Sequence, residues 1–413
     1  MPVEKCKGTR DLSPQEMGRF RAIEGVFRDA CLKWGYREVR TPTLEYLHLF
    51  TSAGTLTPAR LGKVYSFLDW DGWSGERVVL RPDVTIPIAR YCIETGTGNG
   101  PARLFYVANV FSFEETGTET REKWQCGAEL VDAASTTADI ELVVMALDVL
   151  KQLGLSDIEL RLSHAGLIRA LLASRFYRDG LSGEEQSRLF DRILDGDSQA
   201  LTSAKPEFAR LVTPFLSLRG KSSGFLKNVA ATLGRDLPEI DAPLTELTGL
   251  TELLDSLGVK YEIDIASGRG FEYYTGLIFH LSACGEVVAG GGRYDALIPL
   301  LGGKEKPACG FALYMDRLMG LIEPSGLVAP APVRVIVHAE SPAVLKDVFK
   351  LLDSLHHVGY AAGIHLGGKE PSDVKWRVDV NDTAPRFVVK QPGKRASSEA
   401  RTVKEVLASL KTA

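Results

Sequence analysis

The sequence is poor in cysteine and has no cysteine pair at close spacing. Its six cysteines are scattered through 413 residues, and none of them belongs to a CxxC pair. A structural zinc site or a disulfide scaffold is therefore not predicted. Reduced thiols are the default for such a chain, which favours a cytoplasmic protein.

Long apolar runs and a strong charge of either sign are also missing. There is no apolar run of about 18 residues, and no basic-plus-apolar segment at the N-terminus, so we expect neither a membrane span nor secretion. The 49 basic and 53 acidic residues leave a net charge of −4. That balance provides no general attraction to nucleic acid.

Several common catalytic patterns are missing as well. The sequence has no P-loop lysine pattern, no GxGxxG segment leading into a helix and no Gly-x-Ser-x-Gly elbow. Its histidines show no spacing typical of metal ligands. We therefore predict no metal, no cofactor and no catalytic residue from these patterns.

The length of the chain predicts more than one domain. A chain of 413 residues exceeds one ordinary core, and its 45% hydrophobic and 25% charged residues are typical of soluble globular proteins. A proline-bearing linker, residues 323–332, precedes alternating strand and helix patterns. Residues 333–413 are therefore expected to form a small α/β domain.

Local signals predict several elements before that linker. Ser13-Pro14 is a typical helix start, and Gly35 should end a helix that runs to about Trp34. Apolar and β-branched runs predict strands at 36–40, 64–70, 76–80, 103–113 and 123–131. Residues 165–257 are mostly helical by periodicity and carry no sign of chemistry.

Residues 267–276 form the most distinctive stretch, Ser-Gly-Arg-Gly-Phe-Glu-Tyr-Tyr-Thr-Gly, between two short apolar runs. Arg269 stands between two glycines, and its guanidinium can pair with a carboxylate through two parallel hydrogen bonds. Tyr273 and Tyr274 add ring faces and hydroxyls. The stretch is either a ligand grip or a structural salt bridge beside two core tyrosines.

The segments that follow give this stretch a context. Residues 289–295 read Ala-Gly-Gly-Gly-Arg-Tyr-Asp, and residues 309–318 read Cys-Gly-Phe-Ala-Leu-Tyr-Met-Asp-Arg-Leu. In this order they resemble the histidyl-tRNA synthetase family and its non-synthetase relatives. The stretch 267–276 is similar to that family's histidine-recognition signature. Residues 309–318 resemble motif 3 of class II synthetases, with Arg317 at the motif arginine.

The resemblance implies an α/β (α+β) fold. Residues 1–322 would form a class II synthetase-like antiparallel sheet flanked by helices, with a helical insertion at 165–257. Residues 14–45 resemble motif 1, which builds the dimer interface in that family. The small domain at 333–413 stands where the synthetase has its anticodon-binding domain, but it is shorter.

One departure from the family concerns the nucleotide half of the site. Residues 103–131 resemble motif 2, the hairpin that grips ATP, but this chain has Ser112 where the family has an arginine. The loss of one preorganised donor typically removes about 2.7–4 kcal/mol of transition-state stabilisation. We therefore interpret Ser112, Arg121 and Arg317 as a degenerate nucleotide site.

The amino-acid half of the site matches the family better. The resemblance implies a histidine-binding site made of Asp83, Thr85, Gln125, Glu129, Arg269, Tyr273 and Tyr274. Asp83 stands where the synthetase usually has glutamate, and the aspartate form resembles the regulatory subunits of ATP phosphoribosyltransferase. By themselves, Asp83 and Thr85 are equally consistent with a helix cap, and Gln125 and Glu129 with a solvent-facing strand.

Three functions stay open on these residues. The leading hypothesis is a non-catalytic subunit similar to the regulatory subunits of ATP phosphoribosyltransferase, which act in the first step of L-histidine biosynthesis. It would form a dimer, bind a short-form catalytic subunit and take L-histidine as effector. An active histidyl-tRNA synthetase is the runner-up, and an amino-acid-ligating paralogue is the third. Because Ser112, Asp83 and the short C-terminal domain disfavour a synthetase, tRNA is not expected as a partner.

Overall fold

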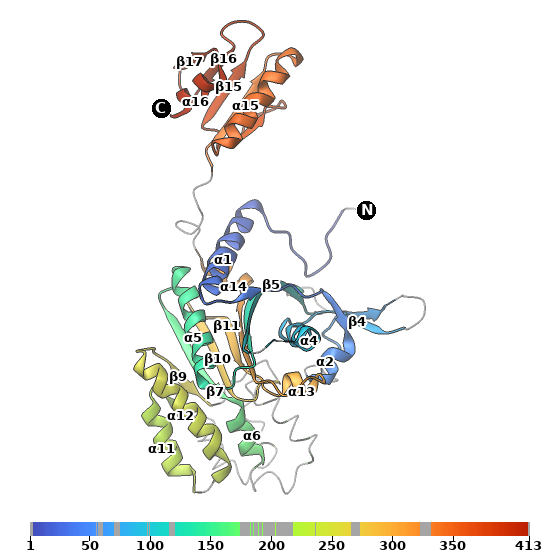
Figure 1. Cartoon of the computed structure of the whole chain (residues 1–413), viewed down its shortest axis with the longest axis vertical. Coiled ribbons are helices and arrows are strands. Elements are labelled where there is room, and N and C mark those ends of the chain that lie inside the picture. The colour runs from blue at the N-terminus through green and yellow to red at the C-terminus, as the bar shows by residue number, and fades with distance from the viewer. Residues whose placement is uncertain are drawn as a thin grey trace. The chain divides into compact units, whose positions relative to one another are not determined.

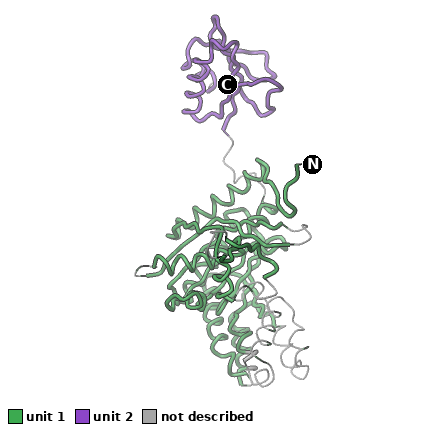
Figure 2. Tube along the Cα trace, turned by 90° about the vertical axis from the view of Figure 1, so that its right-hand side faces the viewer, with its two compact units in different colours: residues 1–327 green, residues 328–413 purple. Residues whose placement is uncertain are grey.

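The computed structural model divides the chain into two compact units, Met1–Leu327 and Val328–Ala413 (Figure 2). The residues that the structure describes are 3–54, 56, 61–69, 75–96, 98, 100–114, 120–173, 182, 185, 189, 192, 203, 218–235, 237–265, 273–322 and 332–411. Arg269 of the predicted site therefore lies outside the described residues.

Unit 1 is built on a nine-stranded sheet with the order β1-β5-β6-β12-β11-β10-β7-β9-β8 (Figure 1). The strands are β1 (Arg37–Glu38), β5 (Ala102–Phe111), β6 (Glu122–Val131), β7 (Ile158–His164), β8 (Arg219–Gly220), β9 (Glu262–Asp264), β10 (Leu277–Ala283), β11 (Glu286–Arg293) and β12 (Ala308–Tyr314). From β5 to β7 every pairing is antiparallel. The predicted antiparallel sheet is confirmed, with parallel pairs only at β1–β5 and β7–β9.

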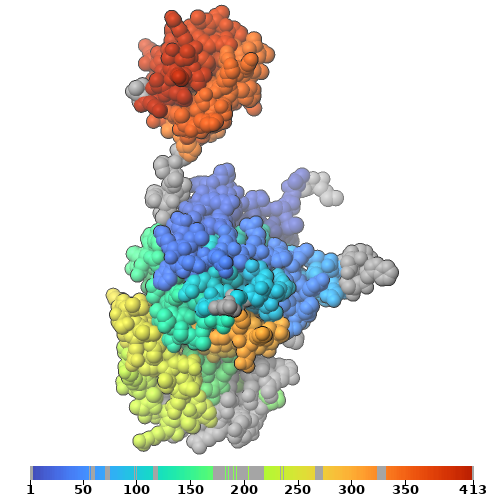
Figure 3. Space-filling view, in the orientation of Figure 1, coloured from blue at the N-terminus to red at the C-terminus, as the bar shows by residue number. Residues whose placement is uncertain are grey.

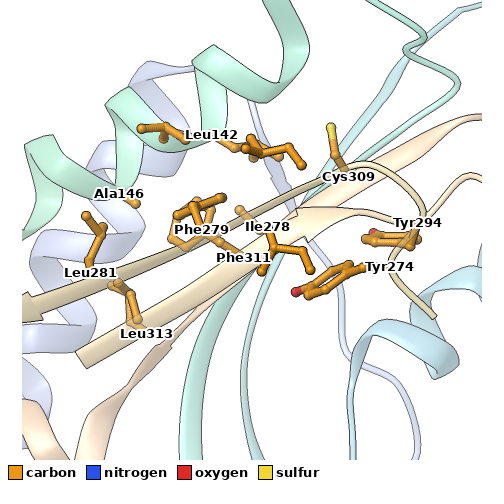
Figure 4. Close-up of a cluster of buried hydrophobic side chains, with 14 of the residues drawn as sticks. Leu142, Ala146, Tyr274, Ile278, Phe279, Leu281, Tyr294, Cys309, Phe311 and Leu313 are labelled. Carbon is orange, nitrogen blue, oxygen red and sulfur yellow. The ribbon is translucent and has the colours of Figure 1, made fainter. Parts of the chain in front are cut away.

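Helices cover one face of this sheet with apolar side chains. These helices include α1 (Pro14–Lys33), α5 (Thr136–Gln152) and α14 (Met315–Leu321). Phe27 of α1 packs edge-on against Phe105 and Phe311 of the sheet. Figure 4 shows Leu142 and Ala146 of α5 on the same side as this core. The opposite face of the sheet carries the candidate functional site and the helix α4 (Thr85–Thr95).

The helix α1 illustrates how local sequence fixes an element. The Ser13 side chain accepts a hydrogen bond from the Glu16 backbone, the Glu16 side chain accepts one from the Ser13 backbone, and Pro14 is the first helical residue. This reciprocal cap satisfies two donors that the helix cannot pair itself. The helix ends just before Gly35, which has a φ of 79°. The predicted helix is confirmed to within one residue.

Other predicted elements are shorter than expected. The strand predicted at 36–40 is only Arg37–Glu38, because it lies at the sheet edge and pairs with β5 alone. The strand predicted at 64–70 is β3 (Ser66–Leu68), which joins β4 (Arg77–Leu80) and β2 (Leu44–Tyr46) in a separate three-stranded sheet. The strand β2 and the short helix α2 (Leu47–Ser52) were not predicted.

Within 165–257 the described elements are mostly helical. They are α6 (Ala165–Ala173), α11 (Ser223–Leu233), the 3-10 turn η2 (Pro238–Ile240) and α12 (Asp241–Ser256), alongside the short strand β8. After the sheet strands β10 and β11 comes the one-turn helix α13 (Leu297–Leu300). No helix in the described part of the chain is long and apolar enough to span a membrane.

Unit 2 is a small α/β fold with its own core. Its sheet has the order β14-β13-β15-β16-β17, with strands Ala361–Ile364, Arg334–Ala339, Trp376–Val380, Phe387–Lys390 and Ser397–Ala400. The turn η3 (Pro342–Val344) and the helices α15 (Leu345–His357) and α16 (Val403–Lys411) complete it. The predicted small α/β domain is confirmed, although β15 and β17 were not predicted.

Candidate functional site

The floor of the candidate site consists of alternate residues from two neighbouring strands. The antiparallel register of β6 and β12 places side by side the pairs Glu129–Gly310, Gly127–Ala312 and Gln125–Tyr314. Residues two apart on a strand share a face, so these six lie on one surface. Phe311 and Leu313 point the other way, into the core with α5 (Figure 4). The predicted spacing of Gln125 and Glu129 on one face is therefore what the structure shows.

Glu129 carries the most deeply buried carboxyl group of the site, with 1% of its surface exposed. Its Oε1 accepts a hydrogen bond from the Thr85 hydroxyl at 2.8 Å, and its Oε2 accepts one from the Tyr294 hydroxyl. Burial raises the pKa of Glu129 to about 8, although both hydroxyl donors pull it down. A pKa in this range favours the protonated form of the carboxyl at neutral pH.

Asp83 both caps a helix and faces the pocket. Its Oδ1 accepts a hydrogen bond from the Ile86 backbone at 2.9 Å, near the start of α4. Its Oδ2 accepts one from the Tyr273 hydroxyl at 3.3 Å. Burial raises the pKa of Asp83 to about 6. Asp83 thus caps α4 and also lines the pocket, so the two roles considered for it, helix capping and ligand binding, are compatible.

Two glycines make room for these groups. A Cβ atom at Gly310 would lie 1.6 Å from Oε2 of Glu129, and one at Gly127 would lie 2.2 Å from the Tyr106 ring. Any larger residue would displace the carboxyl or the ring. These positions on β12 and β6 therefore need glycine for the close approach of a side chain.

The pocket has very little free volume around its polar groups. Its lining consists of Asp83, Thr85, Tyr106, Gln125, Tyr273, Tyr274, Gly290, Tyr294, Gly310, Phe311 and Ala312. The free cavity is about 10 Å³, which is room for about one water molecule. An amino acid can enter only if side chains of this lining move.

The structure brings together six of the seven residues predicted for the amino-acid site, and Arg269 is the one outside the described residues. Sequence reasoning missed Tyr106 and Tyr294. Tyr294 lies in the quoted segment 289–295, and its position directly after β11 was the available signal. For Tyr106 the signal was weaker, since it is one aromatic residue among several in β5.

Of the residues predicted for a degenerate nucleotide site, Ser112 directly follows β5, Arg121 directly precedes β6 and Arg317 lies on α14, and all three contact other parts of the chain. Ser112 is exposed, and its backbone donates to the Arg121 carbonyl at 2.9 Å. The Arg121 guanidinium lies 5.0 Å from the Phe113 ring centre. Arg317 lies 5.1 Å from the Tyr314 ring centre and donates to the Val287 carbonyl. Within the described residues no group of histidine, cysteine, aspartate and glutamate could hold a metal ion.

Comparison with known proteins shows which family the chain belongs to. The histidyl-tRNA synthetase family model matches residues 8–318. The chain belongs to the histidyl-tRNA synthetase family. It is 49% identical to a protein of Dehalococcoides mccartyi named ATP phosphoribosyltransferase regulatory subunit, over 92% of this chain and 91% of the relative. A histidine–tRNA ligase of Archaeoglobus fulgidus is 32% identical over 89% and 87%.

Solved structures in this family share the fold. A Bacillus halodurans protein, described as an ATP phosphoribosyltransferase regulatory subunit/histidyl-tRNA synthetase, gives a TM-score of 0.74 at 24% identity, over 90% of this chain and 96% of the other. The histidyl-tRNA synthetase of Nostoc sp. PCC 7120 gives 0.71 at 18% identity, over 99% and 100%. At such identities the likeness concerns the fold. The predicted resemblance to regulatory subunits is confirmed, because the identity to a regulatory subunit clearly exceeds that to a ligase.

Proposed function

We propose that this chain is the non-catalytic regulatory subunit of an ATP phosphoribosyltransferase, in the first step of L-histidine biosynthesis. The observation that carries the proposal is a pocket that brings together six residues predicted for the amino-acid site, among them Asp83 and Glu129, in a chain that has Ser112 in place of the family's motif 2 arginine. The 49% identity to a protein of that name supports it. The chain would activate a separate short-form catalytic subunit and make it sensitive to histidine, with a coupling free energy of about 1–3 kcal/mol.

The pocket offers matching groups for each part of histidine. Asp83 and Gln125 would hold the α-ammonium, since a carboxylate and an amide oxygen both accept N–H donors. Glu129 and a tyrosine hydroxyl would meet the two imidazole nitrogens, while a ring of Tyr273 or Tyr274 packs on the imidazole face. Arg269 remains our candidate for the α-carboxylate.

Thr85 receives a different role from the one first expected. In the histidine-binding site that the resemblance implies, the Thr85 hydroxyl would help Asp83 to hold the α-ammonium, but in this structure the hydroxyl donates to Glu129 at 2.8 Å. We therefore assign Thr85 to orienting the Glu129 carboxyl. The expected contact with the ammonium passes to Asp83 and Gln125.

Calorimetry with L-histidine and L-phenylalanine, on the chain alone and in complex with the catalytic subunit, tests this pocket. Phenylalanine has a similar ring but no ring nitrogens, so it offers no hydrogen-bond partner to the buried carboxyl and the tyrosine hydroxyl that would meet the imidazole. Each unmet group costs about 1–3 kcal/mol, so phenylalanine should bind far more weakly. If histidine binds neither form, or no better than phenylalanine, the pocket assignment is wrong.

Self-association as a dimer is part of the proposal. On the three-stranded sheet, Leu44, Tyr46 and Phe67 are 48%, 47% and 46% exposed. Tyr46 and Phe67 both pair with Val78, so these rings lie on one face. This hairpin region, light blue in Figure 3, projects from unit 1. An exposed apolar face of this kind, which includes Leu44 at the end of the segment that resembles motif 1 and extends beyond that segment, fits a second copy of the chain.

We place the complex in the cytoplasm, where thiols stay reduced, because all six cysteines of the chain are free. The alternative of an active synthetase is tested by histidine-dependent ATP–pyrophosphate exchange. We expect none, because Ser112 has no charge to offset that of the phosphoryl group. Exchange at a rate ordinary for a synthetase, from protein free of host enzyme, would overturn the regulatory function.

A further inference from the structure

The part of the pocket floor that β12 forms consists of small residues, except at its end, where Tyr314 has a large side chain. Along β12 the pocket face carries Gly310, then Ala312, then Tyr314, which is the last residue of the strand. Gly310 and Ala312 line the pocket. Two residues of a strand span about 7 Å, so the part of this floor that carries only small side chains is about as long as one free amino acid.

The Tyr314 ring is fixed across the neighbouring strand. A Cβ atom at Gly290 of β11 would lie 2.8 Å from the Tyr314 hydroxyl, so the ring reaches over that glycine. The Arg317 guanidinium stacks on the ring at 5.1 Å and is itself held by the Val287 carbonyl. A side chain at position 290 would have to displace the Tyr314 hydroxyl, and the contact with the arginine favours the present position of the ring.

The register indicates which end of a ligand meets this ring. Glu129, the proposed partner of the imidazole, lies opposite Gly310, whereas Gln125 lies opposite Tyr314. A histidine with its ring at Glu129 and its ammonium near Gln125 therefore directs its carboxylate end toward Tyr314. A group attached to that carboxyl would have to occupy the space of the phenol.

We propose that Tyr314, held by Arg317, ends the pocket after the α-carboxylate and so restricts it to free amino acids. Amino acids extended at the carboxyl, such as an acyl-adenylate, are excluded by the ring. This inference rests on the proposed histidine pocket and adds a specificity residue to it. It gives the site a steric barrier to adenylation products that is separate from the change at Ser112.

The test compares two probes by calorimetry on the full chain in complex with its catalytic subunit: L-histidine and 5′-O-(N-histidylsulfamoyl)adenosine, a stable mimic of the adenylate. For the wild type we expect the mimic to bind about 100-fold or more weakly than histidine. Tyr314→Gly should bring the two affinities to within about tenfold. Tyr314→Phe keeps the ring and should keep the discrimination.

Arg317→Ala provides a second route if Tyr314→Gly does not fold. Releasing the ring should strengthen binding of the mimic relative to histidine while the tyrosine remains. Equal binding of both probes by the wild type would overturn this inference and leave the proposed function standing. So would discrimination that survives both Tyr314→Gly and Arg317→Ala. Absence of histidine binding would instead overturn the proposed function, and this inference with it.

Discussion

Two carboxyl groups of the pocket are held in surroundings that disfavour their charge. Burial raises the pKa of Glu129 to about 8 and that of Asp83 to about 6. Neither has a cationic partner among the described residues; their contacts are hydroxyls and a backbone N–H. A ligand that brings an ammonium and ring nitrogens would supply the missing partners. Two buried carboxyl groups without a cationic partner lower the stability of the folded chain, and functional sites are commonly destabilising in this way.

Replacing Glu129 by glutamine should stabilise the empty protein at neutral pH. The carboxyl titrates near 4.5 when unfolded and near 8 when folded, so between these values the folded state holds the extra proton. The free energy of unfolding should then fall as pH rises from 5 to 7.5, by about 1.4 kcal/mol per unit at most. Glu129→Gln lacks this titration, and its stability should depend less on pH.

Urea unfolding at pH 5 and pH 7.5 measures this difference. At pH 7.5 we expect Glu129→Gln to exceed the wild type by about 2 kcal/mol and to lose most of its histidine affinity. The exposed Glu239→Gln is the matched control and should behave as the wild type. A Glu129→Gln variant that is less stable than the wild type at pH 7.5 would contradict the buried, protonated carboxyl.

The pH dependence of histidine binding should report on Asp83. Its pKa near 6 means that below pH 6 a proton must leave before an ammonium can pair with the carboxylate. Histidine affinity should therefore fall by up to about tenfold per pH unit below 6. The free ligand's imidazole also titrates near 6.5, so the slope must be compared with that of a variant.

Asp83→Asn is that variant, because an asparagine oxygen can still cap α4. We expect it to bind histidine weakly at pH 7.5 and to show a shallower fall in affinity below pH 6. Calorimetry between pH 5 and 8 gives both values. Identical slopes for the wild type and the variant would show that Asp83 does not pair with the ligand.

At the scale of elements, local sequence signals were enough to predict an element whose formation depends mainly on its own residues. The cap at Ser13 indicated the start of α1, and apolar and β-branched runs indicated β5 and β6 to within about two positions. The strand β17 (Ser397–Ala400) is mostly exposed and polar, so it exists because β16 pairs with it rather than through its own propensity.

In the candidate site, too, contacts within one strand could be predicted from the sequence and contacts between several strands could not. Gln125 and Glu129 could be paired from their spacing because one strand carries both. Tyr294 reaches Glu129 from the end of β11, with β12 between β11 and β6, and such a contact depends on the order of strands in the sheet. The small cavity and the position of Tyr314 over Gly290 also depend on side chains from several strands.

The exposed face of the three-stranded sheet predicts a mutation that breaks self-association. Phe67→Lys places a charge on the face shared with Tyr46, where a partner subunit would bury it. We expect light scattering to show a monomer or a dissociation constant raised at least about tenfold. Leu68→Lys is the matched control, since Leu68 is 50% exposed on the other face of β3 and should remain a dimer. Equal masses for the two variants would refute this interface.

At the scale of the whole molecule, the chain combines a synthetase-type unit with a small α/β unit. Unit 1 carries both the proposed amino-acid pocket, on its nine-stranded sheet, and the exposed apolar face, on its three-stranded sheet. Unit 2 has a separate core of its own. We expect both units to be present in the complex with the catalytic subunit, and the complex to exceed either component in mass.

The most direct test of the account is the ATP phosphoribosyltransferase activity of a short-form catalytic subunit, measured alone, with this chain, and with this chain plus L-histidine. We predict that the chain raises the activity, that L-histidine then lowers it, and that Glu129→Gln in this chain weakens inhibition by histidine while the activation remains. Activity that is unchanged by the chain at saturating concentration would contradict the regulatory function. Inhibition by histidine that is equally strong with Glu129→Gln would place the effector site outside this pocket.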